Sequence, residues 1–138
     1  MKALPRERLV ALRLPLVELH RALLEMEQRA YEGAHGRVAP AELLQLALTH
    51  DQFAWLHQIS AVIVRIDELT ATGEAPGSGD VDAVVAHIRA LLRPAPEGSR
   101  FEQQYDRAIQ ADPAVLLAHR AVIQALPPES ASTSPTVH

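Results

Sequence analysis

PRERLVALRLPLVELHRALLEMEQRAYE, residues 5–32, is an amphipathic segment with a helical period. Its apolar side chains recur every three or four residues, a spacing that gathers them on one face of an α-helix. Pro15 lies inside this pattern, and because proline lacks the amide donor we expect the helix to kink or restart there. The glycine-containing residues 33–36 end the helix. The apolar stripe consists of Leu9, Leu12, Leu16, Leu19, Leu23, Met26 and Ala30.

A second helical region begins at Pro40, a residue type favoured at the first position of a helix, and extends to about Thr72. Residues Thr49 to Gln52 have the form of a capping box, so two helices that meet there are one alternative. The other alternative is a single long and bent helix, and this is the one that we expect. Its apolar face consists of Leu44, Leu48, Trp55, Ile59, Val62, Ile63 and Ile66.

The next segment predicts an exposed, glycine-containing linker over residues 72–79. A helix over residues 81–93 follows, and we expect Asp80 to cap it. The chain ends in residues 127–138, which consist largely of Pro, Ser, Thr and Ala and are predicted to be a disordered tail.

The segment 99–126 contains two signals for the start of a helix. Ser99 and Glu102 have capping-box spacing, and Asp112 followed by Pro113 fits a cap and a first helical residue. One kinked helix and two separate helices both agree with this pattern.

No segment has the alternating period of a strand. The 138 residues therefore predict an all-α fold, with a single domain over residues 1–126. We expect a helical bundle of about four main helices with up-and-down topology, in which the last helix is kinked or split near Asp112 and Pro113.

Composition and charge exclude several classes of function. The chain has no cysteine, which removes disulfides, thiolate nucleophiles and Cys-based metal sites. The net charge is −4, the basic residues lie beside acidic ones, and only 4% of the residues are aromatic, so nucleic acid is not expected as a partner. No apolar run approaches the roughly 18 residues of a membrane span. We expect no membrane partner and a cytoplasmic location; the many alanines, twelve arginines against one lysine and absence of asparagine suggest a bacterial source.

Two short segments resemble known helical proteins. Phe101, Tyr105, Ala108 and Pro113 are spaced as in the second helix of a tetratricopeptide repeat, but no period of about 34 residues recurs, so the resemblance implies helix-pair packing alone. Phe53 to Leu56, Ser60 and residues 63–68 resemble a pattern in uncharacterised bacterial all-helical proteins. That resemblance implies an all-helical fold and no assigned activity.

His119 lies on an apolar face of the last helix. Burial disfavours the charged form of histidine, so we expect a neutral ring that needs a hydrogen-bond partner. A core histidine with such a partner is the favoured interpretation, and a ligand-binding histidine is the alternative. The apolar face consists of Val115, Leu116, Val122, Ile123 and Leu126.

Four polar residues at the edges of two apolar stripes form a second group of candidates. His20 and Glu27 share one edge of the first helix, and Ser60 and Asp67 share one edge of the second. Residues seven apart on a helix are about 10.5 Å apart, too far for one ion to bridge. If these helices face each other, His20 meets Asp67 or Ser60 in a polar network or at the floor of a pocket.

A metal centre or a catalytic site has little support in the pattern. His50 and His57 are seven residues apart, whereas chelation on one helix needs a spacing of four. Glu32 and His35 form the only Glu-x-x-His motif, and a di-iron bundle needs two. No serine is marked as a nucleophile. We therefore expect no enzymatic activity and no cofactor.

Apolar residues outside the main stripes point to an interaction surface. Val64 and Leu69 are of this kind, and Trp55, interpreted mainly as core, is a natural anchor if it lies at an interface. The first hypothesis is a non-enzymatic protein-interaction or self-associating module, with a protein partner or a homo-oligomer. The alternative is a small-ligand or single-metal site inside the bundle, built from His20, Glu27, Asp67 and His119.

Overall fold

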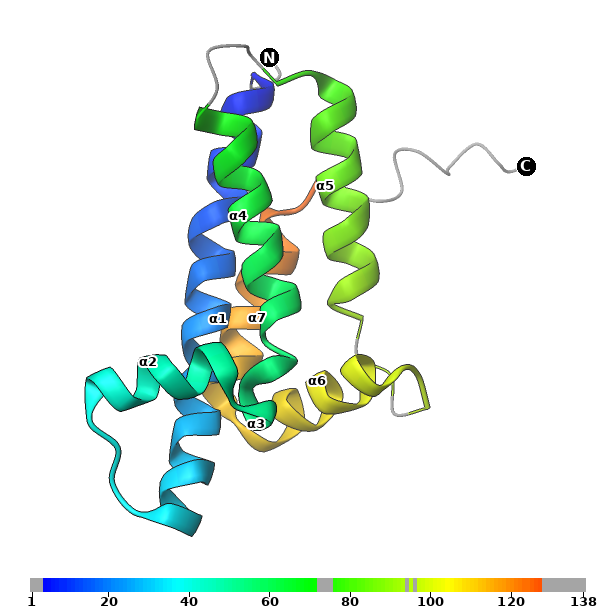
Figure 1. The fold of residues 1–138 in the computed structure, drawn as a ribbon. Coiled ribbons are helices and arrows are strands. Elements are labelled where there is room, and N and C mark those ends of the chain that lie inside the picture. Colours follow the sequence, from blue (N-terminus) through cyan, green and yellow to red (C-terminus); the bar gives the residue numbers. More distant parts are fainter. Residues whose placement is uncertain (1–3, 72–75, 94, 96, 128–138) are drawn as a thin grey trace.

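The structure is a computed structural model that describes residues 4–71, 76–93, 95 and 97–127. These residues form seven helices and no strand (Figure 1). The predicted all-α class is confirmed, with seven helices in place of about four. Their bounds are α1 Pro5–His35, α2 Pro40–Thr49, α3 Asp51–Ala54, α4 His57–Ala71, α5 Ser78–Leu91, α6 Arg100–Ala111 and α7 Pro113–Ala125.

The four longer helices α1, α4, α5 and α7 run along a common direction, and α6 crosses their lower end (Figure 1). The arm formed by α2 and α3 lies at the lower end of α1, and α2 projects away from α5. A single cluster of buried apolar side chains runs through the molecule. Within the described ranges, no helix is long and apolar enough to cross a membrane.

The α1 helix packs against α4, α5 and α7 through its predicted leucine stripe. Leu12 and Leu16 are both buried, so the stripe continues past Pro15 and the helix is unbroken there. Of the two outcomes expected at Pro15, a kink or a restart, the restart is wrong, because core packing on both sides of the proline outweighs the lost backbone hydrogen bond. Gly36 ends the helix with a φ of 89°, a conformation that glycine adopts without strain.

The single long helix expected over residues 40–72 is wrong, because the backbone breaks at His50. This residue is extended (φ −87°, ψ 137°), and its Nδ1 accepts a hydrogen bond from the Gln52 amide at 3.0 Å. Histidine therefore supplies the cap, whereas the Thr49 hydroxyl donates back to the Gln45 carbonyl. Histidine is outside the usual set of capping residues, which is why the pattern did not favour a break.

The first part of the predicted apolar face is also wrong. Leu44 and Leu48 are each 60% exposed, and α2 has no buried residue. The remaining members from Trp55 to Ile66 are buried or half-buried. Because the break at His50 turns α2 away from the direction of α4, its leucines no longer continue the face of that helix.

Both start signals in the segment 99–126 are confirmed. The Ser99 hydroxyl accepts from the Glu102 amide at 3.1 Å and the Glu102 carboxylate accepts from the Ser99 amide at 2.8 Å. Asp112 accepts from the Ala114 amide at 2.9 Å, and Pro113 opens α7. The segment therefore consists of two helices, α6 and α7.

Asp80 does not cap a helix that begins after it. The α5 helix already begins at Ser78, and the Asp80 carboxylate accepts from the Gly77 amide at 2.9 Å. Of the predicted linker, residues 72–75 lie outside the described residues, as do residues 128–138 of the predicted tail.

Candidate functional site

The four candidate ligand residues His20, Glu27, Asp67 and His119 do not share one site. Asp67, Glu27 and His119 each bind a different partner, as described below. Across the described ranges, no group of three or more His, Asp and Glu side chains is placed to hold a metal ion. The structure therefore uses Asp67, Glu27 and His119 as separate contacts between helices.

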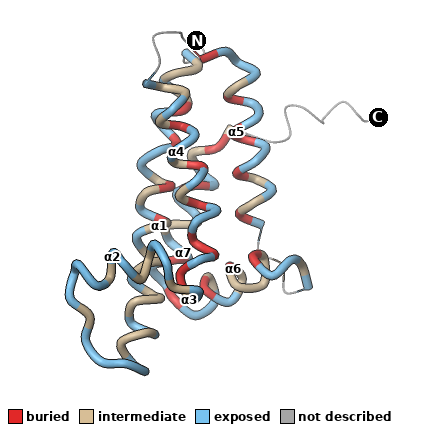
Figure 2. The backbone as a smooth tube through the Cα atoms, in the orientation of Figure 1, coloured by how far each residue is buried: buried red, intermediate tan, exposed pale blue. Residues whose placement is uncertain are grey.

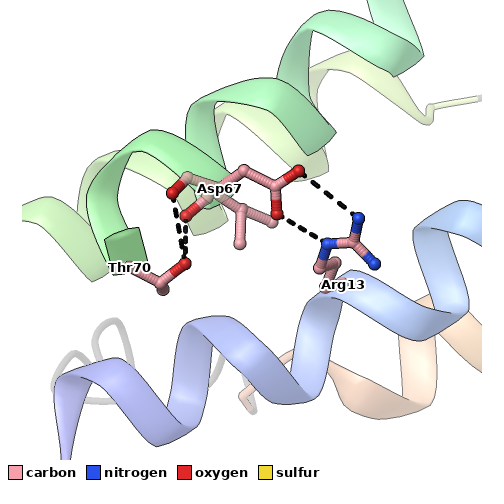
Figure 3. Close-up of polar contacts among 4 residues, drawn as sticks. Arg13, Asp67 and Thr70 are labelled. Atoms are coloured by element: carbon pink, nitrogen blue, oxygen red, sulfur yellow. Dashed lines mark hydrogen bonds and ion pairs between the residues drawn. The ribbon is translucent and has the colours of Figure 1, made fainter. Parts of the chain in front are cut away.

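Asp67 on α4 pairs with Arg13 on α1, and not with His20. Arg13 Nε lies 2.6 Å from Asp67 Oδ1, and Arg13 Nη2 lies 3.4 Å from Oδ2 (Figure 3). The hydrogen bond from Arg13 lowers the pKa of the Asp67 carboxyl. On the same helix the Thr70 hydroxyl donates back to the carbonyls of Ile66 and Asp67. Asp67 thus pairs with Arg13, seven positions before the predicted His20. Spacing within one helix does not determine the register between the antiparallel helices α1 and α4.

Glu27 on α1 holds the α3 segment in place. Its Oε1 accepts from Gln52 Nε2 and its Oε2 accepts from Trp55 Nε1, each at 2.9 Å. Trp55 is 7% exposed and belongs to the core, so its favoured interpretation is correct. Both carboxylate oxygens have donors, which leaves Glu27 with a structural role.

His119 has the hydrogen-bond partner that its buried position requires. The Tyr105 hydroxyl lies 2.7 Å from His119 Nδ1, and the Tyr105 side chain is fully buried. Burial raises the pKa of Tyr105, so the hydroxyl stays protonated in its hydrogen bond with Nδ1. Burial also lowers the pKa of His119, which keeps the ring neutral and able to accept. The pair joins α6 to α7.

His20 is half-buried on the face of α1 toward α4. Burial lowers its pKa, and the nearby His57 lowers the pKa further. Ser60 does not meet His20 through its hydroxyl, which donates to the His57 carbonyl at 3.1 Å. His57 Nε2 in turn lies 2.8 Å from the Ala47 carbonyl, so this ring contacts the end of α2.

We expect the protein to lose stability as the pH falls, because of His20 and His119. Both have folded-state pKa values below the ordinary value of 6.5, so the unfolded chain binds protons first on acidification. The stability that the neutral rings contribute is complete above about pH 6.5 and is lost as the pH falls through their folded-state pKa values. Urea-unfolding midpoints measured between about pH 7.5 and about pH 5 should therefore decrease.

His119→Gln separates the contribution of this ring, because glutamine still accepts from Tyr105 but does not titrate. The variant should show a smaller decrease in midpoint than the natural protein over the same pH range. An equal decrease in both proteins would contradict the assignment to His119.

The residues proposed as an interface differ in exposure. Val64 is 52% exposed, whereas Leu69 is half-buried and packs against the core. Trp55 is also buried. Of the three, Val64 alone offers a largely exposed side chain to a partner.

A hollow of about 270 Å³ lies between α4 and α5. A second hollow of about 250 Å³ shares His87 with it, continues along α5 to Leu91 and is also lined by the start of α6. We call the two together the α4–α5 groove. The lining of its first part consists of Ala61, Val62, Arg65, Asp80, Ala83, Val84 and His87.

The α2 helix exposes the side chains of Leu44 and Leu48, which we call the α2 leucine edge. These residues are four apart and lie on one face of the helix. Figure 2 shows α2 without any buried position, in contrast to the neighbouring helices. Its other face contacts the core through the half-buried Leu43 and Leu46.

A third hollow of about 400 Å³, which we call the Trp55 pocket, opens between the α3 region and α6. Sequence reasoning did not find its polar residues as a group, because they come from different helices. A signal was present on α6, where Arg100 and Gln104 are four residues apart. The lining consists of Asp51, Ala54, Trp55, Gln58, Arg100, Phe101 and Gln104.

No protein-family model matches this chain, and no curated protein or solved structure matches it either. The function therefore has to be inferred from the contacts, hollows and exposed side chains of the chain itself. The α4–α5 groove, the α2 leucine edge and the Trp55 pocket are three features that offer surface to a ligand or a partner.

Proposed function

We propose that this chain is a non-enzymatic, self-associating module of a bacterial cytosol. In this proposal the α2 leucine edge of one copy docks into the α4–α5 groove of the next copy. The observation that carries it is that one chain exposes both an amphipathic helix with two uncovered leucines and a groove with an apolar lining. Burying these two surfaces against each other removes apolar area from water, which favours association.

The dimensions of helix and groove support this pairing. The α2 helix has ten residues, which corresponds to about 15 Å. From Asp80 to Leu91 the groove follows α5 over eleven residue steps, or about 16 Å. Alanines at positions 61, 83 and 90 line the groove, and small side chains allow a docked helix to approach closely.

In this proposal, charged side chains orient the docked helix more than they add to its affinity. Glu42 is the acidic residue in the first turn of α2. The groove lining contains the basic Arg65, together with His87 and the acidic Asp80. Arg65 Nη1 lies 3.8 Å from Glu68 Oε1, and both side chains are exposed to solvent. An exposed ion pair contributes at most about 1 kcal/mol, so the leucines supply most of the proposed affinity.

The arrangement of the two surfaces determines the kind of assembly. The α2 arm and α5 lie on different sides of the chain (Figure 1). An interface between two different patches is heterologous, and such interfaces build closed rings or open filaments. We further interpret α1, α4, α5 and α7 as the up-and-down bundle expected from the sequence, with α2 and α3 as the arm that extends to the next copy.

Native mass spectrometry of three proteins tests this proposal. The natural protein should be oligomeric at micromolar concentration. Ala83→Trp fills the groove, and Leu44→Asp with Leu48→Asp places charge on the α2 leucine edge, so each variant should be monomeric. Mixing the two variants should restore a heterodimer, because one retains an intact leucine edge and the other an intact groove.

Ala121→Trp, at an exposed position on α7, is the control, and Val64→Asp on α4 tests the interface residue expected from the sequence. Both variants should keep the mass of the natural protein. A monomeric natural protein, or a mixture of the two surface variants that stays monomeric, would contradict the proposal. If Val64→Asp is the only variant that loses the oligomer, the interface lies on the exposed face of α4 that carries Val64.

A further inference from the structure

The Trp55 pocket combines charges of both signs with an aromatic floor. Asp51 lies on one wall, at the start of α3, and Arg100 lies on the other, at the start of α6. Gln58 and Gln104 add two side-chain amides. In the part of the chain that the structure describes, none of these four side chains forms a hydrogen bond or an ion pair, and none has an unprinted partner among those residues.

The floor of the pocket is held rigidly. Trp55 and Phe101 are each 7% exposed, and their ring centroids are 5.4 Å apart in an edge-to-face contact. The Trp55 Nε1–H donates to Glu27 at 2.9 Å, which fixes the orientation of the indole. A site whose apolar wall is already ordered loses little conformational entropy when a ligand binds.

We propose that the Trp55 pocket binds a zwitterionic α-amino acid with an apolar side chain. The guanidinium of Arg100 binds the carboxylate, since its planar fork of N–H donors matches two carboxylate oxygens. The carboxylate of Asp51 binds the ammonium group. The ligand's side chain lies on Trp55 and Phe101. The amides of Gln58 and Gln104 form hydrogen bonds with the carboxylate lone pairs and ammonium N–H groups that Arg100 and Asp51 leave unpaired.

The presence of both charges selects this class of ligand over simpler ones. Asp51 repels an anion that lacks a compensating ammonium group, and Arg100 repels a cation that lacks a carboxylate. A purely apolar ligand leaves four polar side chains without partners, which costs binding free energy when they lose water. The volume of about 400 Å³ is within the range of small-ligand sites.

This inference rests on the Trp55 pocket and is independent of the proposed self-association. Gln58 and Phe101 border both the pocket and the far end of the α4–α5 groove. Ligand binding is therefore also measured on the variant with Leu44→Asp and Leu48→Asp, in which the proposed interface is blocked and Trp55 remains the only tryptophan. Binding by that variant separates the two proposals, because either can fail alone.

The fluorescence of Trp55 reports occupancy directly, because it is the only tryptophan and forms part of the pocket lining. The standard L-amino acids other than tryptophan are titrated at millimolar concentrations, with calorimetry as a second readout. Apolar members such as L-leucine should change the emission in a saturable way. N-acetyl-L-leucine and L-leucinamide each lack one charge and should bind about tenfold more weakly, the loss expected for one charge-assisted hydrogen bond.

Two conservative variants assign the contacts. Arg100→Gln should weaken binding of L-leucine about tenfold and should remove the advantage of L-leucine over L-leucinamide. Asp51→Asn should remove its advantage over N-acetyl-L-leucine. Arg120→Gln on α7 and Asp82→Asn on α5 change the same kinds of charge at exposed positions elsewhere and should bind as the natural protein does.

The proposal is overturned if no standard amino acid gives a saturable change in fluorescence or heat. It is also overturned if L-leucine, its amide and its N-acetyl form bind equally, because the pocket then does not recognise a zwitterion. Equal binding by the natural protein and both conservative variants would place the ligand elsewhere. Circular dichroism of each variant establishes that it is folded.

Discussion

Replacing Phe53 with alanine is expected to lower the free energy of unfolding by about 3–5 kcal/mol, the range for large-to-small changes at buried aromatic residues. Phe53 is fully buried and is the only buried residue of α3, a helix of four residues. So short a helix has no stability of its own and depends on packing. Its ring centroid lies 6.3 Å from that of Tyr31 on α1 and 6.1 Å from that of His50.

The loss should be greatest in the arm formed by α2 and α3. Urea unfolding measures the total change, and hydrogen exchange of residues 40–54 measures the local opening. Because α2 carries the proposed docking edge, oligomer formation should weaken in parallel with the exchange protection. Val64→Ala, at a largely exposed position, is the control and should change stability by less than about 0.5 kcal/mol. A Phe53→Ala effect as small as that of the control would contradict the anchoring role.

The second large effect is expected at Asp112, which makes two contacts at the corner between α6 and α7. Its Oδ1 accepts from the Ala114 amide at 2.9 Å, and its Oδ2 lies 2.6 Å from Arg29 Nη2 on α1. Asp112→Ala removes both contacts and should lower stability by about 2 kcal/mol. Loss of the helix cap accounts for about 1 kcal/mol of this, and loss of the charged hydrogen bond for about 1 kcal/mol.

Asp112→Asn separates the helix cap from the charged hydrogen bond, because asparagine can still cap α7 but carries no charge. Asp112→Asn should therefore cost about half as much as Asp112→Ala. A double-mutant cycle with Arg29→Ala gives the coupling between the two side chains. The Arg29 side chain is 61% exposed and that of Asp112 is 11% exposed, so the coupling should lie near the upper end for exposed pairs, about 1 kcal/mol. If Asp112→Asn and Asp112→Ala are equally destabilising, the cap contributes nothing measurable.

Local signals in the sequence were sufficient for the helices that begin with ordinary capping chemistry. Ser99 with Glu102, and Asp112 with Pro113, place their hydrogen bonds within three residues, so no knowledge of the rest of the fold is needed. The leucine stripe from Leu9 to Leu23 is likewise a property of one helix. The break at His50 was only the alternative to one long helix, because histidine is outside the usual set of capping residues.

The candidate site was predictable only residue by residue. The need of His119 for a hydrogen-bond partner follows from its apolar neighbours, but Tyr105 as that partner depends on how α6 folds back against α7. The contact between Glu27 and Trp55 joins positions 28 residues apart, and the Arg13–Asp67 pair joins positions 54 apart. Such contacts depend on the register between helices, which no spacing within one helix contains.

Helical class, the apolar stripe of α1 and the caps of α6 and α7 thus follow from interactions between near neighbours in the chain, whose geometry is the same in any fold. The exposure of Leu44 and Leu48, the contact of Glu27 with Trp55 and the meeting of Asp51 with Arg100 around one pocket follow from helix packing. Packing depends on the direction in which the chain leaves each turn, and a change at one residue such as His50 redirects an entire helix. For this reason the surfaces proposed to bind a second copy and an amino acid could be located only after the helices had been placed in space.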